Sequence, residues 1–250
     1  CMKYYRPEKV EEAIKLLAQG VPLSGGTSLT PKRRSLEAVI DLEKLGMDQI
    51  KIDSEKVGLG AATKLQDLIE VGADLPDHLT RACRLEAAWN LRNMATMAGT
   101  IMAGDGRSPL LVVLLALGTE VTIHDESDKT PLNVLLDRRD EGGNPFLITE
   151  LTFDIPNKLR YEYVARAPTD RPLVSAAAAL SSSKEGLKVA IGGFGKRPRL
   201  LNDDRASSIS EWKELAAEQY ADAGDAFASS AYRSEVAAIL VERVLKEVQS

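Results

Sequence analysis

Apolar residues recur every three or four positions near the start of the chain. The residues that share this helical face are Val10, Ala13, Ile14 and Leu17. Pro7 precedes the pattern and Gly20 follows it. Proline is tolerated in the first turn of a helix, and glycine commonly ends one. The pattern therefore predicts an amphipathic helix over residues 7–20.

Short apolar runs follow this helix and predict strands. They are Val21–Leu23, Ala38–Leu42 and Ile50–Ile52, with a further helix expected between the first two. Together these elements predict a first αβ unit over residues 1–55, with a glycine-rich loop at its centre.

A second group of elements is expected over residues 56–155. A strand and loop at Val57–Thr63 precede a helix at Lys64–Val71. Another helix is predicted at Leu79–Asn90. A buried helix is predicted at Pro109–Gly118, where proline begins and glycine ends an apolar run. The strands predicted after it are Glu120–His124 and Phe146–Ile155.

The last block covers residues 160–250 and follows a polar, proline-containing stretch, Pro156–Arg160, that is typical of a linker. Its apolar runs predict three strands, joined by turns such as Lys184–Gly186. The strands are Tyr161–Arg166, Leu173–Ser183 and Leu187–Phe194. Two helices follow, and the last carries Val236, Ile239, Leu240 and Val244 on one face. The order of elements indicates the α+β fold class.

Composition narrows the class of protein without identifying it. The chain has 250 residues, of which 44% are hydrophobic, and a formal net charge of −5. An acidic balance argues against a nucleic-acid surface, so the basic run Lys32–Arg34 is interpreted as a solvated turn. No stretch approaches the ~20 apolar residues of a membrane span. No signal-peptide pattern opens the chain, and the expected location is the reducing cytoplasm.

Candidate metal ligands are few. Cys1 and Cys83 provide no ligand or disulfide framework, and His78 and His124 stand apart from other ligand types. Both histidines are expected at the surface, so no metal site is predicted.

Two loops rich in small and hydroxyl residues are the candidate binding elements. The first is the SGGTS turn at Ser24–Ser28, and the second lies within Leu91–Leu111 and contains Thr96, Gly99 and Thr100. Free backbone amides in such turns bind anionic oxygens. Paired glycines are also common in ordinary turns, so the pattern leaves a plain turn and a phosphate site both open. Neither loop has the GxGxxG spacing of a Rossmann fold.

Taken together in their order, several segments resemble the FAD-binding medium subunits of molybdenum hydroxylases, such as carbon monoxide dehydrogenase and xanthine dehydrogenase. The similar segments are YYRPEKVEEAIKLLAQG, PLSGGTSLTP, VIDLEKL, VGLGAATKLQDL, LRNMATMAGT, LLALGTEVTI and DAFASSAYRSEVAAILVERVL. In the last one, the resemblance lies in Asp225, Ser229, Tyr232 and Arg233. The likeness covers nearly the whole chain.

This resemblance implies a two-part FAD-binding (PCMH-type) module over residues 1–155, divided near residue 55. It also implies a C-terminal α+β domain over residues 160–250, with a three-stranded sheet and helices. FAD is the implied cofactor, with its flavin ring between module and C-terminal domain. The residues implied to bind it are Ser24, Gly25, Gly26, Thr27, Ser28, Leu29, Thr96, Ala98, Gly99, Thr100, Asp105 and Leu147. Weaker candidates are Gly60, Ala61 and Thr63 near the cofactor, and Tyr161, Tyr163 and Arg166 near the ring, these last three more simply interpreted as ordinary strand residues.

The chain departs from the family pattern at two places. The family usually has two glycines and an asparagine where this chain has Ala98, Gly99 and Thr100. A methyl group at Ala98 is harmless if φ is negative and a clash if φ is positive. The family also often has an acidic residue just before the buried helix, where this chain has Pro109, so Asp105 is a candidate substitute.

The resemblance implies an oxidoreductase subunit that passes electrons from iron–sulfur clusters through flavin to an external acceptor. The implied partners are a molybdenum cofactor-binding large subunit and a 2Fe-2S small subunit, commonly in a dimer of heterotrimers. No general base is expected, because substrate chemistry belongs to the large subunit. The altered second loop leaves a flavin-free structural or assembly subunit as an alternative. The glycine turns alone would also fit a small nucleotide-binding enzyme of another family.

Overall fold

The computed structural model describes residues 2–181, 186–201 and 208–250. The chain forms two compact units. Unit 1 comprises Cys1–Gly72, Ala87–Ala103 and Glu120–Phe153. Unit 2 comprises Ala73–Glu86, Gly104–Thr119 and Asp154–Ser250. Each unit is thus assembled from three separate stretches of the sequence.

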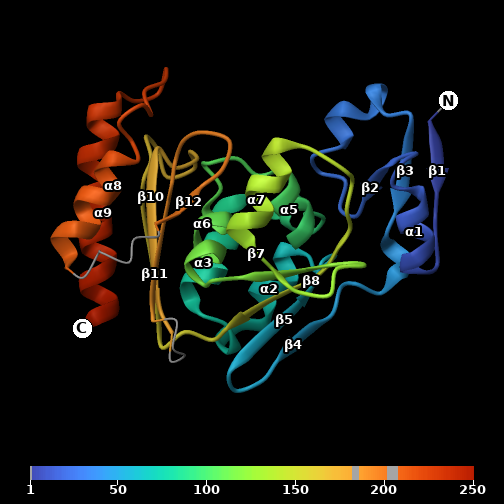
Figure 1. The fold of residues 1–250 in the computed structure, drawn as a ribbon, viewed down its shortest axis with the longest axis horizontal. Coiled ribbons are helices and arrows are strands. Elements are labelled where there is room, and N and C mark those ends of the chain that lie inside the picture. Colours follow the sequence, from blue (N-terminus) through green and yellow to red (C-terminus); the bar gives the residue numbers. More distant parts are fainter. Residues whose placement is uncertain (1, 182–185, 202–207) are drawn as a thin grey trace. The chain divides into compact units, whose positions relative to one another are not determined.

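A small parallel sheet lies at the beginning of unit 1 (Figure 1). Its order is β1-β3-β2, with β1 at Lys3–Tyr5, β2 at Val21–Leu23 and β3 at Ala38–Asp41. The predicted amphipathic helix is α1, Val10–Leu16, and its Ala13 is packed with Ile40 in one core cluster. The connection from β2 to β3 contains the 3-10 helix η1, Thr30–Ser35. Parallel strands need such a crossover, and it leaves the loop after β2 at the end of the sheet.

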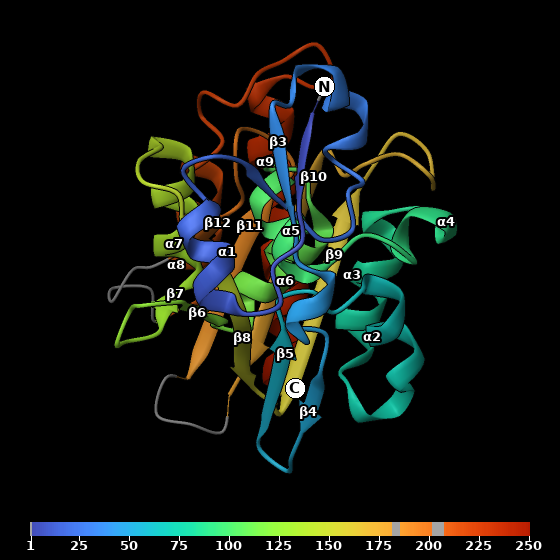
Figure 2. The same cartoon turned by 90° about the vertical axis from the view of Figure 1, so that its right-hand side faces the viewer.

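The second sheet of unit 1 has five strands in the order β4-β5-β8-β6-β7 (Figure 2). They are β4, Ile50–Ile52; β5, Lys56–Gly60; β6, Glu120–Ile123; β7, Thr130–Pro131; and β8, Ile148–Asp154. The helices of unit 1 that accompany it are α2, Leu65–Val71; α4, Trp89–Arg92; α5, Met97–Ala103; and α7, Leu132–Glu141. Two short 3-10 helices, η2 at Glu43–Leu45 and η3 at Gly72–Asp74, complete the connections.

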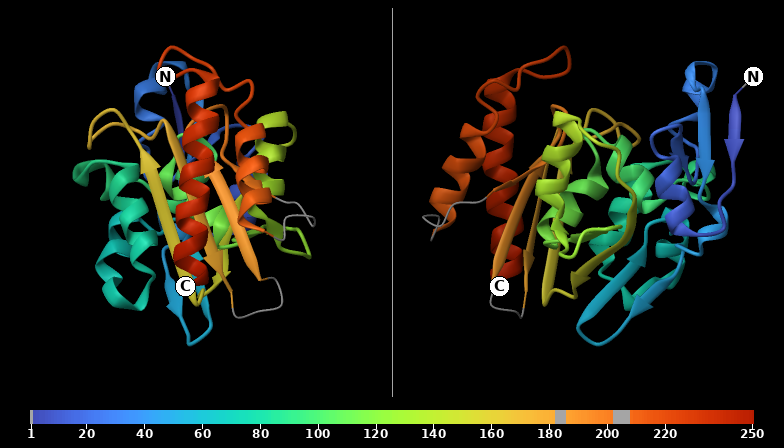
Figure 3. Two further views of the ribbon diagram at one scale, coloured as in Figure 1. Left: turned by 90° about the vertical axis from the view of Figure 1, so that its left-hand side faces the viewer. Right: turned by 45° about the vertical axis from the view of Figure 1, so that its right-hand side comes forward.

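Unit 2 is built around an antiparallel sheet in the order β12-β11-β10-β9 (Figure 3). The strands are β9, Lys158–Val164; β10, Val174–Leu180; β11, Leu187–Gly192; and β12, Arg199–Leu201. Helices α8, Ile209–Glu218, and α9, Ser230–Gln249, cover one face of this sheet. Helices α3, Asp77–Glu86, and α6, Pro109–Ala116, lie against the other. Small residues Ala176 and Ala178 on β10 let the helix α9 pack closely, together with Leu240 and Val244.

The predicted buried helix is α6, and the sequence explains both of its ends. Ser108 caps it by accepting a hydrogen bond from the Leu111 amide, and Pro109 is its first residue. Gly118, with φ of 65°, follows its last turn. All eight residues of α6 are buried, as a helix that is apolar on every side requires. Within the described ranges, no helix is long and apolar enough to cross a lipid bilayer.

Several predicted boundaries are wrong. The helix expected at Leu79–Asn90 ends at Glu86, and α4 begins separately at Trp89. The expected linker Pro156–Arg160 is wrong from Lys158 onward, because the alternation of exposed Lys158 and buried Leu159 continues into strand β9. A fourth strand, β12, joins the three predicted strands. It was not predicted because its three residues are too few to show an alternation of apolar and polar positions. Within the predicted strand Leu173–Ser183 and the turn Lys184–Gly186, residues 182–185 lie outside the described residues.

The two units divide the chain differently from the sequence-based domains. The last stretch of unit 2 begins at Asp154, and the sequence-based boundary was expected between residues 155 and 160. However, Ala73–Glu86 and Gly104–Thr119 belong to unit 2, although both lie within the expected second subdomain. These two stretches carry α3 and α6, whose apolar faces pack against the sheet of unit 2.

Candidate functional site

The loop after β2 presents an unbroken row of backbone amides. Within the part of the chain that is described, no hydrogen bond is donated by the amides of residues 24–28. Gly26 has a φ of 70°, in the left-handed region that favours glycine. Its carbonyl accepts hydrogen bonds from the amides of Leu29, at 3.1 Å, and Thr30, at 2.9 Å. Such a turn holds successive N–H groups in a concave arrangement that binds anions. We call residues 24–28 the amide cradle.

Gly25 brings the amide cradle into contact with the second loop. A Cβ atom at this position would lie only 1.7 Å from the carbonyl oxygen of Met94. Because the carbonyl of Met94 is backbone and the position of a Cβ is fixed by the backbone of residue 25, a side chain at residue 25 would force the two loops apart. The two glycines are therefore required for different reasons. Gly26 adopts a positive φ, and at Gly25 there is no room for a side chain.

The second loop is organised differently from the first, because three successive amides donate hydrogen bonds within the fold. The Met97 amide donates to the carbonyl of Thr63 at 2.9 Å, and the Ala98 amide donates to that of Ala61 at 3.0 Å. The Gly99 amide donates to Thr96 Oγ1 at 3.3 Å. The second loop therefore places the packed start of helix α5 beside the cradle, and the amides of Met97, Ala98 and Gly99 are not available to a ligand.

The substitution at Ala98 is tolerated by the backbone. Asp125 is the single non-glycine residue with positive φ across residues 2–181, 186–201 and 208–250, so φ of Ala98 is negative. Gly99 is not among the glycines with positive φ either. Neither position of the altered second loop therefore requires a glycine for its backbone conformation.

A cavity of about 580 Å³ lies in unit 1 beside both loops. This volume is within the range of small-molecule sites. The expected residues that line it are Ser24, Gly25, Gly26, Thr27, Ser28, Leu29, Thr96, Ala98, Gly99 and Leu147, with Ala61 from the weaker candidates. Gly60, Thr63 and Thr100 are not part of the lining. Thr63 and Thr100 are buried, and their backbones hold the second loop in place.

Sequence reasoning missed part of the cavity wall. Lys32, interpreted as part of a solvated turn, lines the cavity, whereas Arg33 and Arg34 do not. Arg138 and Arg139 of α7 also contribute, as do residues 142–146 of the loop that follows them. The signal for this loop was the second paired glycine, in the run GGNP, which has the composition of a turn between two predicted elements.

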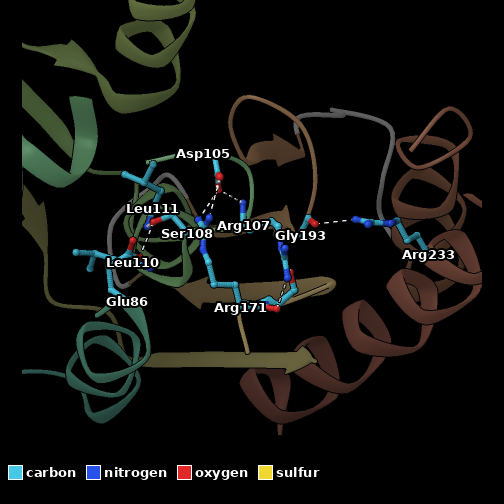
Figure 4. A network of polar contacts seen from close by, with 10 residues as sticks. Glu86, Asp105, Arg107, Ser108, Leu110, Leu111, Arg171, Gly193 and Arg233 are labelled. Atoms are coloured by element: carbon cyan, nitrogen blue, oxygen red, sulfur yellow. Dashed lines mark hydrogen bonds and ion pairs between the residues drawn. The ribbon is translucent and has the colours of Figure 1, made fainter. Parts of the chain in front are cut away.

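Asp105 lies in unit 2 and is held in a polar network (Figure 4). Its carboxylate accepts hydrogen bonds from Arg171, at 2.9 Å, and from the Arg107 amide, at 2.8 Å. Burial alone would raise the pKa of Asp105, but these donors hold it below its usual value. Asp105 is not among the residues that line the cavity of unit 1. The network gives this carboxylate a structural role in the turn before α6.

The acidic group at the start of α6 is Glu86, which reaches it from the end of α3 (Figure 4). Its carboxylate accepts hydrogen bonds from Ser108 Oγ, at 2.6 Å, and from the Leu110 amide, at 3.0 Å. Burial raises the pKa of Glu86 and outweighs the lowering effect of these hydrogen bonds. A negative charge is favourable at a helix N-terminus. Pro109 occupies the position expected to be acidic, and Glu86 supplies a carboxyl beside it.

The remaining candidates of unit 2 contact other residues of that unit. Tyr161 and Tyr163 stack on β9 with ring centroids 5.8 Å apart, and burial raises the pKa of Tyr161. The Arg166 guanidinium lies 5.2 Å from the ring centroid of Phe227. His78 and His124 are both partly exposed, and Nδ1 of His78 accepts a hydrogen bond from the Tyr161 amide at 3.2 Å.

The C-terminal motif is explained by an ion pair between a buried guanidinium and an exposed carboxylate. Arg233 is fully buried and forms two hydrogen bonds of 2.7 Å with the carboxylate of Asp225. It also donates to the carbonyls of Leu173, at 2.9 Å, and Gly193, at 2.6 Å. Ser229 caps the same helix, α9. The motif therefore ties the start of α9 to two loops beside the sheet.

These features define a class of protein: an α+β chain with an anion-binding loop beside a cavity of small-molecule size. Residues 1–140 match the family described as "FAD binding domain in molybdopterin dehydrogenase". The chain belongs to this family, and FAD is its cofactor. The unbonded amide cradle fits a group with anionic phosphate oxygens.

The relatives extend the likeness to the whole chain. It is 28% identical to the glyceraldehyde dehydrogenase medium chain of Sulfolobus acidocaldarius, with 98% of this chain and 97% of the relative covered. It is 25% identical to the nicotine 6-hydroxylase medium subunit of Paenarthrobacter nicotinovorans, covering 98% and 96%. The fold is similar to a chain of CO dehydrogenase from Oligotropha carboxidovorans, with a TM-score of 0.81, 21% identity and coverage of 100% and 98%.

Proposed function

We propose that this chain is the FAD-binding electron-transfer subunit of a molybdenum-containing hydroxylase or dehydrogenase complex. In this role it passes electrons from iron–sulfur clusters, through flavin, to an external acceptor. The observation that carries the proposal is the amide cradle, whose donors are unused within the described chain and line the cavity of unit 1. Full-length likeness to two medium subunits of oxidoreductases supports it.

The protein's own part in this function is binding and orientation. The amides of the cradle would hold the pyrophosphate of FAD, and the apolar wall at Pro145, Phe146 and Leu147 would exclude water. Flavin supplies the exchange between one-electron and two-electron transfer when it is bound. The proposal assigns no general base to this chain, because the oxidation of an organic substrate would take place on the molybdenum subunit.

The proposed partners are a large subunit that binds the molybdenum cofactor and a small 2Fe-2S subunit. Together with this chain they would form a heterotrimer, with a dimer of heterotrimers as the expected assembly. The names of the relatives support this, since "medium chain" and "medium subunit" describe components of larger enzymes. The cytoplasm remains the predicted location of the complex.

The test of this function is the visible spectrum of the purified full chain after incubation with excess FAD and removal of free nucleotide. A flavin spectrum with about one FAD released per chain is the expected result. A colourless protein would contradict the proposal and favour the flavin-free alternative. Gly25→Ala is a matched variant for this test, because its added methyl would separate the two loops. It should lose bound flavin.

A further inference from the structure

Both arginines that line the cavity are already paired with carboxylates. Arg138 Nη1 donates to a carboxylate oxygen of Glu126 at 2.6 Å. Arg139 Nη2 lies 2.8 Å from Asp140 Oδ1, and both side chains of this second pair are mostly buried. Each positive charge is therefore compensated, so neither arginine gives the cavity a net positive charge.

Lys32 is the exception. It lines the same cavity, its residue is exposed, and no carboxylate of the described residues pairs with it. An ammonium group carries three donors and a full charge. The cavity wall therefore has one uncompensated positive charge, in addition to the partial charges of the amide cradle.

The backbone holds Lys32 close to the cradle. The Lys32 amide donates to the carbonyl of Leu29 at 2.9 Å, within the first turn of η1. Thr30 Oγ1 donates to the carbonyl of Gly26 at 2.8 Å, which ties η1 to the cradle. The Cα position of Lys32 is thus fixed within one helical turn of the cradle, and both Lys32 and the cradle line the same cavity.

We propose that Lys32 binds the pyrophosphate of FAD through its Nζ atom, as the charged partner of the amide cradle. This inference rests on the proposed function. A pyrophosphate carries two negative charges, and backbone amides supply partial charges only. An ammonium group beside them adds a charge-assisted hydrogen bond and makes FAD binding sensitive to salt.

The experiment measures the Kd of FAD for the flavin-free full chain by flavin fluorescence, at low and high KCl. The variants are Lys32→Gln, Lys32→Arg and Arg34→Gln. Arg34 is the matched control, because it lies in the same helix η1, is exposed, and does not line the cavity. Lys32→Arg keeps the charge on a long side chain.

The expected result is a Kd about tenfold higher for Lys32→Gln at low salt, as for the loss of one partly exposed charge-assisted hydrogen bond. The difference should shrink at high KCl, while Lys32→Arg and Arg34→Gln remain close to the wild type. If Lys32→Gln and Arg34→Gln raise the Kd of FAD equally, the proposal is overturned, because the positive charge of the whole segment would then explain both effects. An unchanged Kd of FAD in Lys32→Gln would overturn the role of Lys32 and leave the proposed FAD-binding function unaffected. Failure of the wild-type chain to bind FAD would overturn both.

Discussion

At the scale of single residues, the amide cradle depends on a glycine whose role is steric. Gly25→Ala would place a methyl carbon 1.7 Å from the Met94 carbonyl oxygen, so the backbone of one loop must move. We expect a loss of stability of about 1–3 kcal/mol, as for other overpacked sites, and a loss of FAD affinity of tenfold or more. Thermal unfolding and FAD titration measure the two effects.

Gly58→Ala is the control for this prediction. Gly58 lies in the same unit, has no positive φ, and its added Cβ would meet only ordinary contacts, the nearest being the Glu150 Oε1 atom at 3.4 Å. Its stability and FAD affinity should remain near those of the wild type. If Gly25→Ala binds FAD as tightly as Gly58→Ala, the contact between the two loops is not needed for the site.

Arg233 gives a second prediction at this scale, in unit 2. Arg233→Met would remove the buried guanidinium that joins Asp225 to the carbonyls of Leu173 and Gly193. The exposed carboxylate of Asp225 would be hydrated, but the two buried carbonyls would lose their donor, which should cost about 2 kcal/mol. Arg233→Lys should also destabilise the chain, because an ammonium lacks the planar fork that reaches all three acceptors. Urea denaturation measures both changes, and a wild-type midpoint for either would contradict this role.

At the scale of elements, the junction of α3 and α6 should make stability depend on pH. The pKa of Glu86 is raised by burial above the ordinary value of 4.5. A carboxyl with a raised folded-state pKa favours the folded state fully below its unfolded pKa, and this contribution is lost as pH rises through the folded pKa. Glu86→Gln is neutral at every pH and its side-chain oxygen still accepts hydrogen bonds. It should match the wild type near pH 4 and be more stable at neutral pH.

Glu242 on α9 provides a control of opposite sign. Lys213 and Lys246 lower its pKa to about 2. Its contribution is therefore present above pH 4.5 and lost as pH falls toward 2, so Glu242→Gln should be the less stable protein at neutral pH. Urea midpoints from pH 4 to pH 8 measure both variants. A Glu86→Gln chain that is less stable than the wild type at neutral pH would show that the buried carboxylate is needed in its charged form.

The elements were predictable from sequence where the signal was local. The α6 helix has an apolar run, a capping serine, a proline at its start and a glycine after its end, and all of these lie close together in the sequence. The strand β1 and the strand β12 are each three residues long and show no period. Their pairing with β3 and β11 depends on residues far away in the sequence.

The candidate site shows the same limit. The cradle was predictable because Ser24–Ser28 carry its residues in one short run, and the family resemblance added Leu147. The contact between Gly25 and the Met94 carbonyl, and the wall formed by Lys32, Arg138 and Arg139, join segments that no local pattern connects. The carboxyl of Glu86 at the start of α6 is likewise supplied by a residue distant in the sequence, so no local pattern predicts it.

At the scale of the whole molecule, the order of residues along the chain does not follow its two compact units. The sequence alone suggests that residues 1–155 form a module and residues 160–250 a separate domain. In the structure, α3 and α6 precede that boundary but belong to unit 2. All eight residues of α6 are buried, and β10, β11 and β12, which pack against it, come from after the boundary.

This arrangement predicts the behaviour of a fragment of residues 1–155. Without the sheet of unit 2, one side of a fully apolar helix would be exposed to water, and burying it elsewhere would require a different packing. We expect the fragment to aggregate, or to show helical circular dichroism without cooperative unfolding, and to bind FAD far more weakly than the full chain. Size-exclusion chromatography, urea denaturation and FAD titration measure these outcomes. A fragment that is monomeric, unfolds cooperatively and binds FAD like the full chain would show instead that the sequence-based boundary is the functional one.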